Sequence, residues 1–296
     1  MIRHRRRFLI ALAILCLPAL EPVRAETQGH VSPGGTEVAL PLPLSSGSTV
    51  RPARFHLARN TDRSASRTNA TYSSESHTRR LWDENYPFYL KILNMPFNRE
   101  LLSGRLDEKI FRNYIIQDYH YLQNYRKVYG ILLAKAPDET AARFIVTLIH
   151  GIDEEIARIH HTYMKKLHIS GEELSSTPPY PSTEFYNSFL IKTAALEPFE
   201  VGLAATLPCH WIYYRLGMDM KKSQPGEKGK YREWIDGYGA GPWEDSETKK
   251  VVDFVEDWMR KTTDETRSRM KKAYETAMKL EYLFWDGVYR DVKWVE

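Results

Sequence analysis

One thiol stands in a segment rich in aromatic and apolar residues. Cys209 lies within residues 207–214, where Trp211 and Tyr213 are spaced so that they could close around a flat heterocycle. The only other cysteine, Cys16, falls in an apolar N-terminal stretch with the composition of a cleaved leader. Cys209 would then lack an intramolecular disulfide partner. It is a candidate for a buried apolar side chain, an intermolecular link or a reactive nucleophile.

Two carboxyl groups interrupt apolar helical stripes elsewhere in the chain. Asp118 shares a predicted helix face with Tyr114, Tyr121 and other apolar residues, and Glu281 shares one with Phe284 and Trp285. A lone carboxylate on such a face carries a large desolvation cost unless it is paired, hydrogen-bonded or given a ligand. For Asp118 the alternatives are a hydrogen bond to a buried Tyr or Trp, or a place at the stripe edge facing water.

A chemical site follows if the helices bring Asp118, Cys209 and Glu281 together. Such a site would hold a nucleophile and two groups that can move protons at a ring nitrogen and an amine. The segment from Tyr231 to Gly239 adds aromatic residues, and the helix end that Gly237 predicts would let Tyr238 point inward. Packing in the core is the simpler interpretation of these aromatic side chains.

Other kinds of site find little support in the sequence. No His has a Glu three residues before it, as carboxylate-bridged di-iron bundles require, and zinc motifs, phosphate loops and the Gly-x-Ser-x-Gly elbow are absent from the sequence. His160 and His161 follow Asp153, Glu154 and Glu155, and we interpret this cluster as an exposed helix face of mixed charge. We therefore predict no metal site.

Helical periodicity dominates the chain from Leu81 onward. Apolar residues recur at three and four with few strand-like alternations, which predicts an all-α, multi-helix bundle of seven or eight helices. Asp107 and Asp138 are placed to cap the second and third helices. The predicted helices cover residues 81–102, 107–135, 138–168, 181–196, 199–218, 228–238, 245–262 and 264–289.

The first eighty residues read as a leader followed by a disordered N-terminal extension. Residues 1–25 have the basic, apolar and small-residue order of a signal peptide. Residues 26–80 are rich in Ser, Pro, Gly and Arg without helical periodicity, which suits a flexible linker or a transit-like segment. We expect a secreted protein, or one that a two-part leader sends to a plastid-type organelle, with no stable membrane association after leader cleavage.

The net charge of +4 divides unevenly at this boundary. Residues 1–80 hold 12 arginines and 5 acidic residues, a net charge of +7, which leaves 30 basic and 33 acidic residues, a net charge of −3, in residues 81–296. A slightly acidic body is not expected to bind nucleic acid by counterion release. The body has the usual size of one domain with a substantial core.

Residues 81–296 resemble the TenA (thiaminase II) family. Five elements carry the resemblance in order: Leu81-Trp82, then Phe111-x-x-Tyr114-x-x-Gln117-Asp118-Tyr119-x-Tyr121-Leu122, then Pro208-Cys209-x-Trp211-x-Tyr213, then Trp234-Ile235-x-x-Tyr238, then Glu281-x-x-Phe284-Trp285-Asp286. The resemblance implies a haem-oxygenase-like helical bundle, assembled as a homotetramer. The retained Cys209 places the chain with the cysteine-containing branch.

The resemblance also implies an activity and its residues. The activity is cofactor-free hydrolysis of thiamin or of its 5-aminomethyl pyrimidine degradation product, which yields 4-amino-5-hydroxymethyl-2-methylpyrimidine for thiamin salvage. Cys209 matches the nucleophile, Glu281 the acid that protonates a ring nitrogen, and Asp118 the residue that engages the exocyclic amine. The residues that match the substrate pocket are Tyr121, Tyr186, Tyr213, Tyr238 and Phe284.

Two other functions fit the same bundle. A PqqC-like oxidase also works without a metal, although the pairing of Cys209 with Glu281 argues against it. A non-enzymatic protein that binds thiamin or its pyrimidine would keep the aromatic residues but would need no thiol. Thiamin and its degraded pyrimidine share the ring that the motifs address, so either is a candidate substrate.

Overall fold

The computed structural model describes residues 76–157, 161–223, 229–238 and 241–295. The predicted signal peptide, Cys16, nearly all of the predicted linker and His160 lie outside these residues. The described residues form helices and no strands, which confirms the all-α prediction. None of these helices combines the length and apolarity that a membrane span requires.

The helices follow one another in a single order along the chain. They are α1 (His77–Leu93), α2 (Pro96–Leu102), α3 (Glu108–Ala134), α4 (Glu139–Glu155), α5 (His161–Lys166), α6 (Gly171–Ser176), α7 (Pro181–Leu196), α8 (Phe199–Ser223), α9 (Arg232–Gly237), the 3-10 helix η2 (Trp243–Asp245), α10 (Glu247–Lys261) and α11 (Asp264–Tyr289).

Local capping explains where several helices begin. The carboxylate of Asp107 accepts a hydrogen bond from the Lys109 amide, and that of Asp138 accepts one from the Ala141 amide, so both predicted caps are confirmed. Pro181 occupies the first turn of α7, where its missing amide costs nothing. The predicted bounds of α3, α7, α10 and α11 are correct to within two residues.

The first predicted helix, 81–102, is wrong in two respects. It is two helices, because Pro96 holds Met95 in an extended conformation and α2 starts anew after it. It also begins earlier, at His77, because Ser76 caps α1 and the Glu256 carboxylate of α10 accepts the Thr78 amide at 2.7 Å. The start of α1 therefore depends on a residue far away in the sequence.

The third predicted helix, 138–168, is also divided. Helix α4 ends at Glu155 and is followed by two π-helical residues, whose wider turn interrupts the α-helical ladder. Helix α5 begins at His161, and the short helix α6, which was not predicted, is capped by Ser170. Helix α8 extends five residues beyond its predicted end at 218, and α9 is shorter than predicted.

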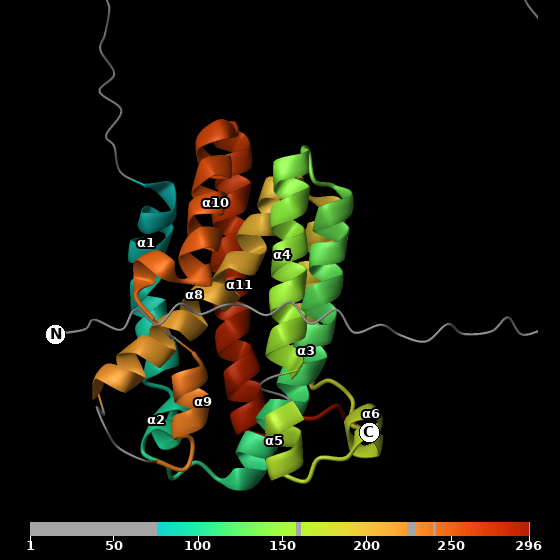
Figure 1. The fold of residues 1–296 in the computed structure, drawn as a ribbon, viewed down its shortest axis with the longest axis vertical. Coiled ribbons are helices and arrows are strands. Elements are labelled where there is room, and N and C mark those ends of the chain that lie inside the picture. The colour runs from blue at the N-terminus through green and yellow to red at the C-terminus, as the bar shows by residue number, and fades with distance from the viewer. Residues whose placement is uncertain (1–75, 158–160, 224–228, 239–240, 296) are drawn as a thin grey trace, which may run out of the picture. The chain divides into compact units, whose positions relative to one another are not determined.

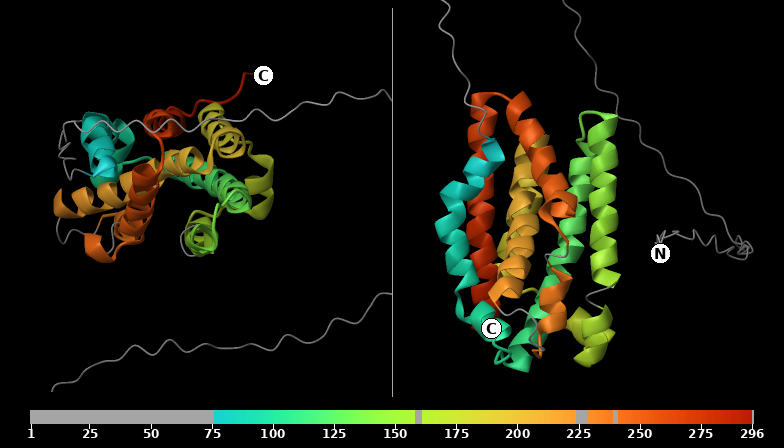
Figure 2. Two further views of the ribbon diagram at one scale, coloured as in Figure 1. Left: turned by 90° about the horizontal axis from the view of Figure 1, so that it is seen from above. Right: turned by 60° about the vertical axis from the view of Figure 1, so that its left-hand side comes forward.

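Helices α8 and α11 pack extensively against each other at the centre of the bundle. Figures 1 and 2 show α1 on one side of this pair and α3 and α4 on the other, and α10 contacts α8 and α1. Helix α7 contacts α3, α8 and α11, while α9 packs on α8. The largest fully buried side chains are mostly aromatic, so the core is built from rings contributed by several helices.

Candidate active site

Helix α8 carries Cys209 between Pro208 and His210. Pro208 lies inside the helix and has no amide hydrogen, so the carbonyl of Ala204 loses its usual helical donor. Residues before it are small or apolar and fully buried, which holds this part of α8 in the core. Cys209 itself is a free, partly exposed cysteine that packs against the core.

Behind the thiol, two tyrosines tie α3 to α8. The Tyr125 hydroxyl donates to the Thr206 carbonyl at 2.7 Å, and the Tyr129 hydroxyl lies 2.8 Å from Nε2 of His210. Burial lowers the pKa of His210 to about 4, so this imidazole is neutral at neutral pH. These two hydrogen bonds hold α8 against α3 on both sides of Cys209 without adding charge.

Glu281 of α11 is the most clearly perturbed acid. Its side chain is 2% exposed, and it accepts a 2.9 Å hydrogen bond from the Tyr186 hydroxyl of α7. Burial raises the pKa of Glu281 to about 8; the Tyr186 hydrogen bond opposes this rise and the charge of Asp118 adds to it. Glu281 therefore keeps its proton at neutral pH and can act as an acid.

Asp118 of α3 lies in the interior, 3% exposed, and so does not face water. Its negative charge raises the pKa of Glu281 and of Cys209, so the fold brings all three groups into one electrostatic cluster. For the thiol, burial raises the pKa well above its ordinary value, and the charge of Glu281 is the next largest cause. Cys209 is therefore protonated at rest and must lose its proton when it attacks.

Aromatic rings from four helices surround this cluster. We call the five predicted pocket residues the aromatic cage. At one end the Tyr121 ring lies 5.0 Å from the Tyr186 ring and 6.0 Å from the Phe284 ring. At the other end Tyr213 lies 5.0 Å from Tyr238. Tyr121, Tyr186 and Phe284 thus form one group of ring contacts, and Tyr213 and Tyr238 form another.

Neighbouring aromatic side chains support the cage from behind. Tyr114 stacks on Trp285 at 5.0 Å, and its hydroxyl donates to that of Tyr213 over 3.4 Å. Trp234 lies 4.8 Å from Tyr238. These rings fix the Tyr213 end of the cage against α11 and α9.

The Tyr121 hydroxyl and the Trp285 indole act on the two reactive groups of the site. Hydrogen bonding from Tyr121 works against the rise in the pKa of Cys209, and hydrogen bonding from Trp285 works against the rise in the pKa of Glu281. Beside them, the buried indole nitrogen of Trp234 has no hydrogen-bond partner among the described residues. An unsatisfied buried donor costs about 1–3 kcal/mol.

Glu155 is the residue of this site that the sequence analysis missed. We expected it to lie with Asp153 and Glu154 on an exposed face, but it is partly buried and accepts a 2.9 Å hydrogen bond from the Tyr238 hydroxyl. The helical spacing could have predicted this position, because Leu148 and Ile152 are buried and residue 155 lies on the same face of α4.

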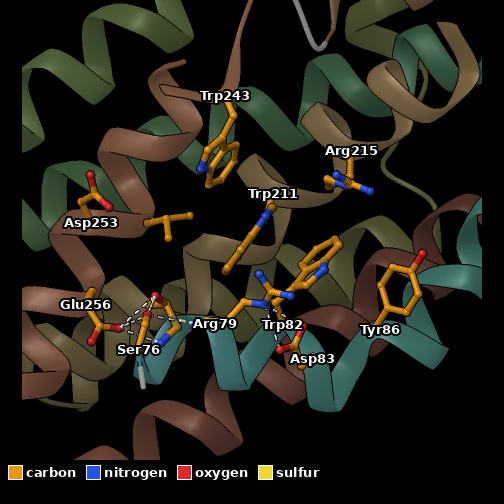
Figure 3. Close-up of a pocket in the computed structure, with 12 residues that line it drawn as sticks. Ser76, Arg79, Trp82, Asp83, Tyr86, Trp211, Arg215, Trp243, Asp253 and Glu256 are labelled. Atoms are coloured by element: carbon orange, nitrogen blue, oxygen red, sulfur yellow. Dashed lines mark hydrogen bonds and ion pairs between the residues drawn. The ribbon is translucent and has the colours of Figure 1, made fainter. Parts of the chain in front are cut away.

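A surface groove lies apart from this site. It has a volume of about 660 Å³ and is lined by Trp82, Trp211 and Trp243, with Arg79, Asp83 and Arg215 among its polar residues (Figure 3). Trp211 follows Cys209 by two positions, which turns it about 200° around α8, away from the thiol. The groove is therefore separate from the cage.

Metal-binding clusters are also absent from the part of the chain that the structure describes. No group of three or more His, Cys, Asp or Glu side chains there could hold a metal ion. His161 begins α5 and is exposed.

Comparison with known proteins gives a consistent picture. The model of the TENA/THI-4/PQQC family matches residues 82–291. An aminopyrimidine aminohydrolase of Bacillus subtilis is 30% identical over 199 residues, which are 67% of this chain and 84% of the relative. A Helicobacter pylori protein of the same name is 27% identical, over 67% of this chain and 91% of the relative.

Solved structures resemble the fold. A TenA homologue from P. horikoshii OT3 superimposes with a TM-score of 0.63 at 24% identity and covers 73% of this chain and 99% of its own. A Shewanella denitrificans domain with a heme oxygenase-like fold superimposes with a TM-score of 0.55 at 18% identity, covering 72% and 92%. The predicted haem-oxygenase-like bundle is thereby confirmed.

Proposed function

Because the chain belongs to the TENA/THI-4/PQQC family, we propose that it hydrolyses the aminopyrimidine moiety of thiamin or of its degradation products, with Cys209 as nucleophile. The product would be 4-amino-5-hydroxymethyl-2-methylpyrimidine, which serves thiamin salvage. The names of the relatives support the reaction class. The observation that carries the proposal is a protonated Glu281 and a thiol in one aromatic cage.

Glu281 begins the proposed reaction as a general acid. With a pKa of about 8 it is roughly nine-tenths protonated at neutral pH, so its proton is available to a ring nitrogen. Protonation draws electrons from the ring and makes a ring carbon electrophilic. The aromatic cage holds the flat ring by stacking, which fixes the nitrogen near Glu281.

Cys209 then adds to the activated ring carbon. The thiol transfers its proton to Asp118 as the carbon–sulfur bond forms, which overcomes the raised pKa of the thiol without a free thiolate. Aromaticity is lost, and the electron pair released from the ring expels the amine or thiazole from the adjacent methylene. Water adds to that methylene and loses a proton. The ring nitrogen then returns its proton to Glu281, and the sulfur leaves with the proton held by Asp118 as the ring regains its aromaticity.

The decisive test is product formation without oxygen. The full chain is incubated anaerobically with the aminomethyl pyrimidine or with thiamin, and the hydroxymethyl pyrimidine is followed by mass spectrometry. Cys209→Ala is expected to lower turnover about 100-fold or more, because it removes the nucleophile. Cys16→Ala, which removes the only other thiol, is the matched control and is expected to keep full activity.

Other outcomes separate the remaining functions. Full turnover by Cys209→Ala contradicts the proposed nucleophile. A product that forms only with oxygen points to an oxidase, and unchanged binding without product points to a binding protein. The ratio of the two rates identifies the preferred substrate.

We further propose a homotetramer that enters the secretory route, as the family resemblance and the leader composition suggest. Sedimentation of the purified protein tests the assembly. The N-terminal sequence of the mature protein, combined with its localisation in cells, tests the leader.

A further inference from the structure

Helix α7 presents an exposed apolar face beside a groove. Phe185 and Leu196 are 58% and 74% exposed, which makes them the two most exposed large apolar side chains in the described helices. Leu196 and Phe189 also line a groove of about 470 Å³ between α7 and the first half of α11. Single exposed apolar residues are ordinary, but a set gathered on one helix beside a groove indicates an interaction surface.

A line of polar residues runs along the same side of α7. Glu184, Ser188 and Lys192 follow one another at intervals of four, and all three are exposed. Glu184 accepts a 3.1 Å hydrogen bond from the Ser188 hydroxyl, and neither Glu184 nor Lys192 has an ion-pair partner among the described residues. The small Ser188 therefore lies midway between a negative and a positive group, each about 6 Å away along the helix.

We propose that α7 packs antiparallel against α7 of a second copy of the chain, with a two-fold axis beside Ser188. The inference rests on the proposed homotetramer and assigns one of its contacts. In this pairing Glu184 of each copy faces Lys192 of the other, so one contact contains two ion pairs. The arrangement is self-complementary, as an isologous contact requires, and the charges fix its register.

The apolar residues add affinity to this register. At 100° per residue, Phe185 and Leu196 lie on the same flank of the polar line, within about 20° of each other around α7. A two-fold axis brings these flanks of both copies to one side of the contact. Phe185 of each copy then lies next to Leu196 of the other, and the four side chains form one apolar strip. Its burial supplies most of the stabilisation, because exposed charge pairs contribute little.

The symmetry of a tetramer makes the consequence specific. A tetramer with dihedral symmetry needs two different two-fold contacts, and the α7 contact is one of them. Loss of this contact is therefore expected to leave dimers held by the other contact.

Sedimentation of the full chain tests the contact. Phe185→Glu combined with Leu196→Glu is expected to shift the mass from tetramer to dimer, with the dimer–tetramer Kd raised at least about 100-fold, because four charges would meet in the apolar strip. Val146→Glu is the matched control, since Val146 of α4 is 51% exposed, and it is expected to sediment as wild type. An equal shift with Val146→Glu would show that the effect is not specific to α7 and would overturn the inference.

Charge reversal tests the register. Glu184→Lys alone and Lys192→Glu alone each place like charges opposite one another and are expected to weaken the tetramer. The combination of both restores opposite charges and is expected to restore assembly. Ser188→Cys is expected to form a covalent dimer under mild oxidation, because the two residues flank the axis, whereas Val146→Cys is not.

The outcomes separate this inference from the hydrolase proposal. A wild-type monomer overturns both the contact and the tetramer, while product formation by the same preparation decides the hydrolase. A tetramer that is unchanged by the Phe185→Glu and Leu196→Glu pair, or a double charge reversal that fails to restore assembly, overturns the α7 contact alone.

Discussion

Replacement of Glu281 by glutamine is expected to stabilise the protein at neutral pH while it abolishes most of the activity. The side chain is buried and its pKa is raised from 4.5 to about 8, mainly by burial. In the unfolded chain this carboxyl ionises near its ordinary pKa. Between those two values unfolding releases a proton, so the free energy of unfolding falls as the pH rises. Glutamine has a similar shape and does not ionise.

The size of the effect follows from the two pKa values. Each unit of difference is worth about 1.4 kcal/mol, and linkage gives a loss of about 3 kcal/mol in wild type between about pH 5 and about pH 7.5. The free energy of unfolding of Glu281→Gln should not show this loss, because glutamine does not ionise. Turnover is expected to fall about 10²- to 10⁴-fold, because the variant has no proton to donate to the ring.

Urea denaturation at the two pH values, at one protein concentration, measures the difference. The measurement gives the difference in free energy of unfolding between wild type and Glu281→Gln at each pH. Ionisable groups that both proteins share cancel in this difference, so its change with pH reports on Glu281. A gap that stays constant from about pH 5 to about pH 7.5 would show that Glu281 ionises normally. In that case the reasoning that makes it an acid catalyst fails with it.

Two further predictions concern the stability of the bundle, one about a buried carboxylate and one about the packing of a glycine. Glu256→Gln acts with the opposite pH sign: although burial works against it, hydrogen bonds from Thr78, Arg260 and Ser76 lower the pKa of Glu256 to about 2. The free energy of unfolding of wild type should therefore exceed that of the variant by about 3 kcal/mol above about pH 4.5, and this advantage should disappear toward about pH 2. A difference in unfolding free energy that does not change across that pH range would contradict this. Gly202→Ala should cost about 1–3 kcal/mol, because its methyl group would sit 2.7 Å from Leu132 and 3.1 Å from the Ala194 backbone. Gly130→Ala, which meets nothing within 4 Å, should gain about 0.5–1 kcal/mol in the same thermal melts, and an equal loss at both glycines would refute the packing argument.

The parts of the fold that the sequence predicted well are those that short-range signals control. Helix α7 begins at Pro181 and α11 follows its cap Thr263, and both have their predicted bounds. The prediction failed at the start of α1, where a residue far away in the sequence determines where the helix begins. Ser76 and Thr78 donate hydrogen bonds to Glu256, some 180 positions away, and no local sequence pattern predicts that contact.

The candidate site divides in the same way. The apolar stripes around Asp118 and Glu281 predicted a conflict between charge and burial, and both side chains are indeed buried. Glu155 was missed because it stands in a run of acidic residues whose composition suggests a solvated face. Only the register of α4 and the inward turn of Tyr238 bring it to the cage.

The groups that would perform the chemistry are also the groups that cost the fold stability. Glu281 keeps its proton because water is excluded, and the buried Trp234 indole nitrogen lacks a hydrogen-bond partner among the described residues. Each of these is a loss that an apolar side chain of similar shape would avoid. The stacked rings of Tyr114 and Trp285 and the extensive packing of α8 on α11 offset that loss. If the proposed ring nitrogen accepts the Glu281 proton, binding of the ligand recovers part of this loss.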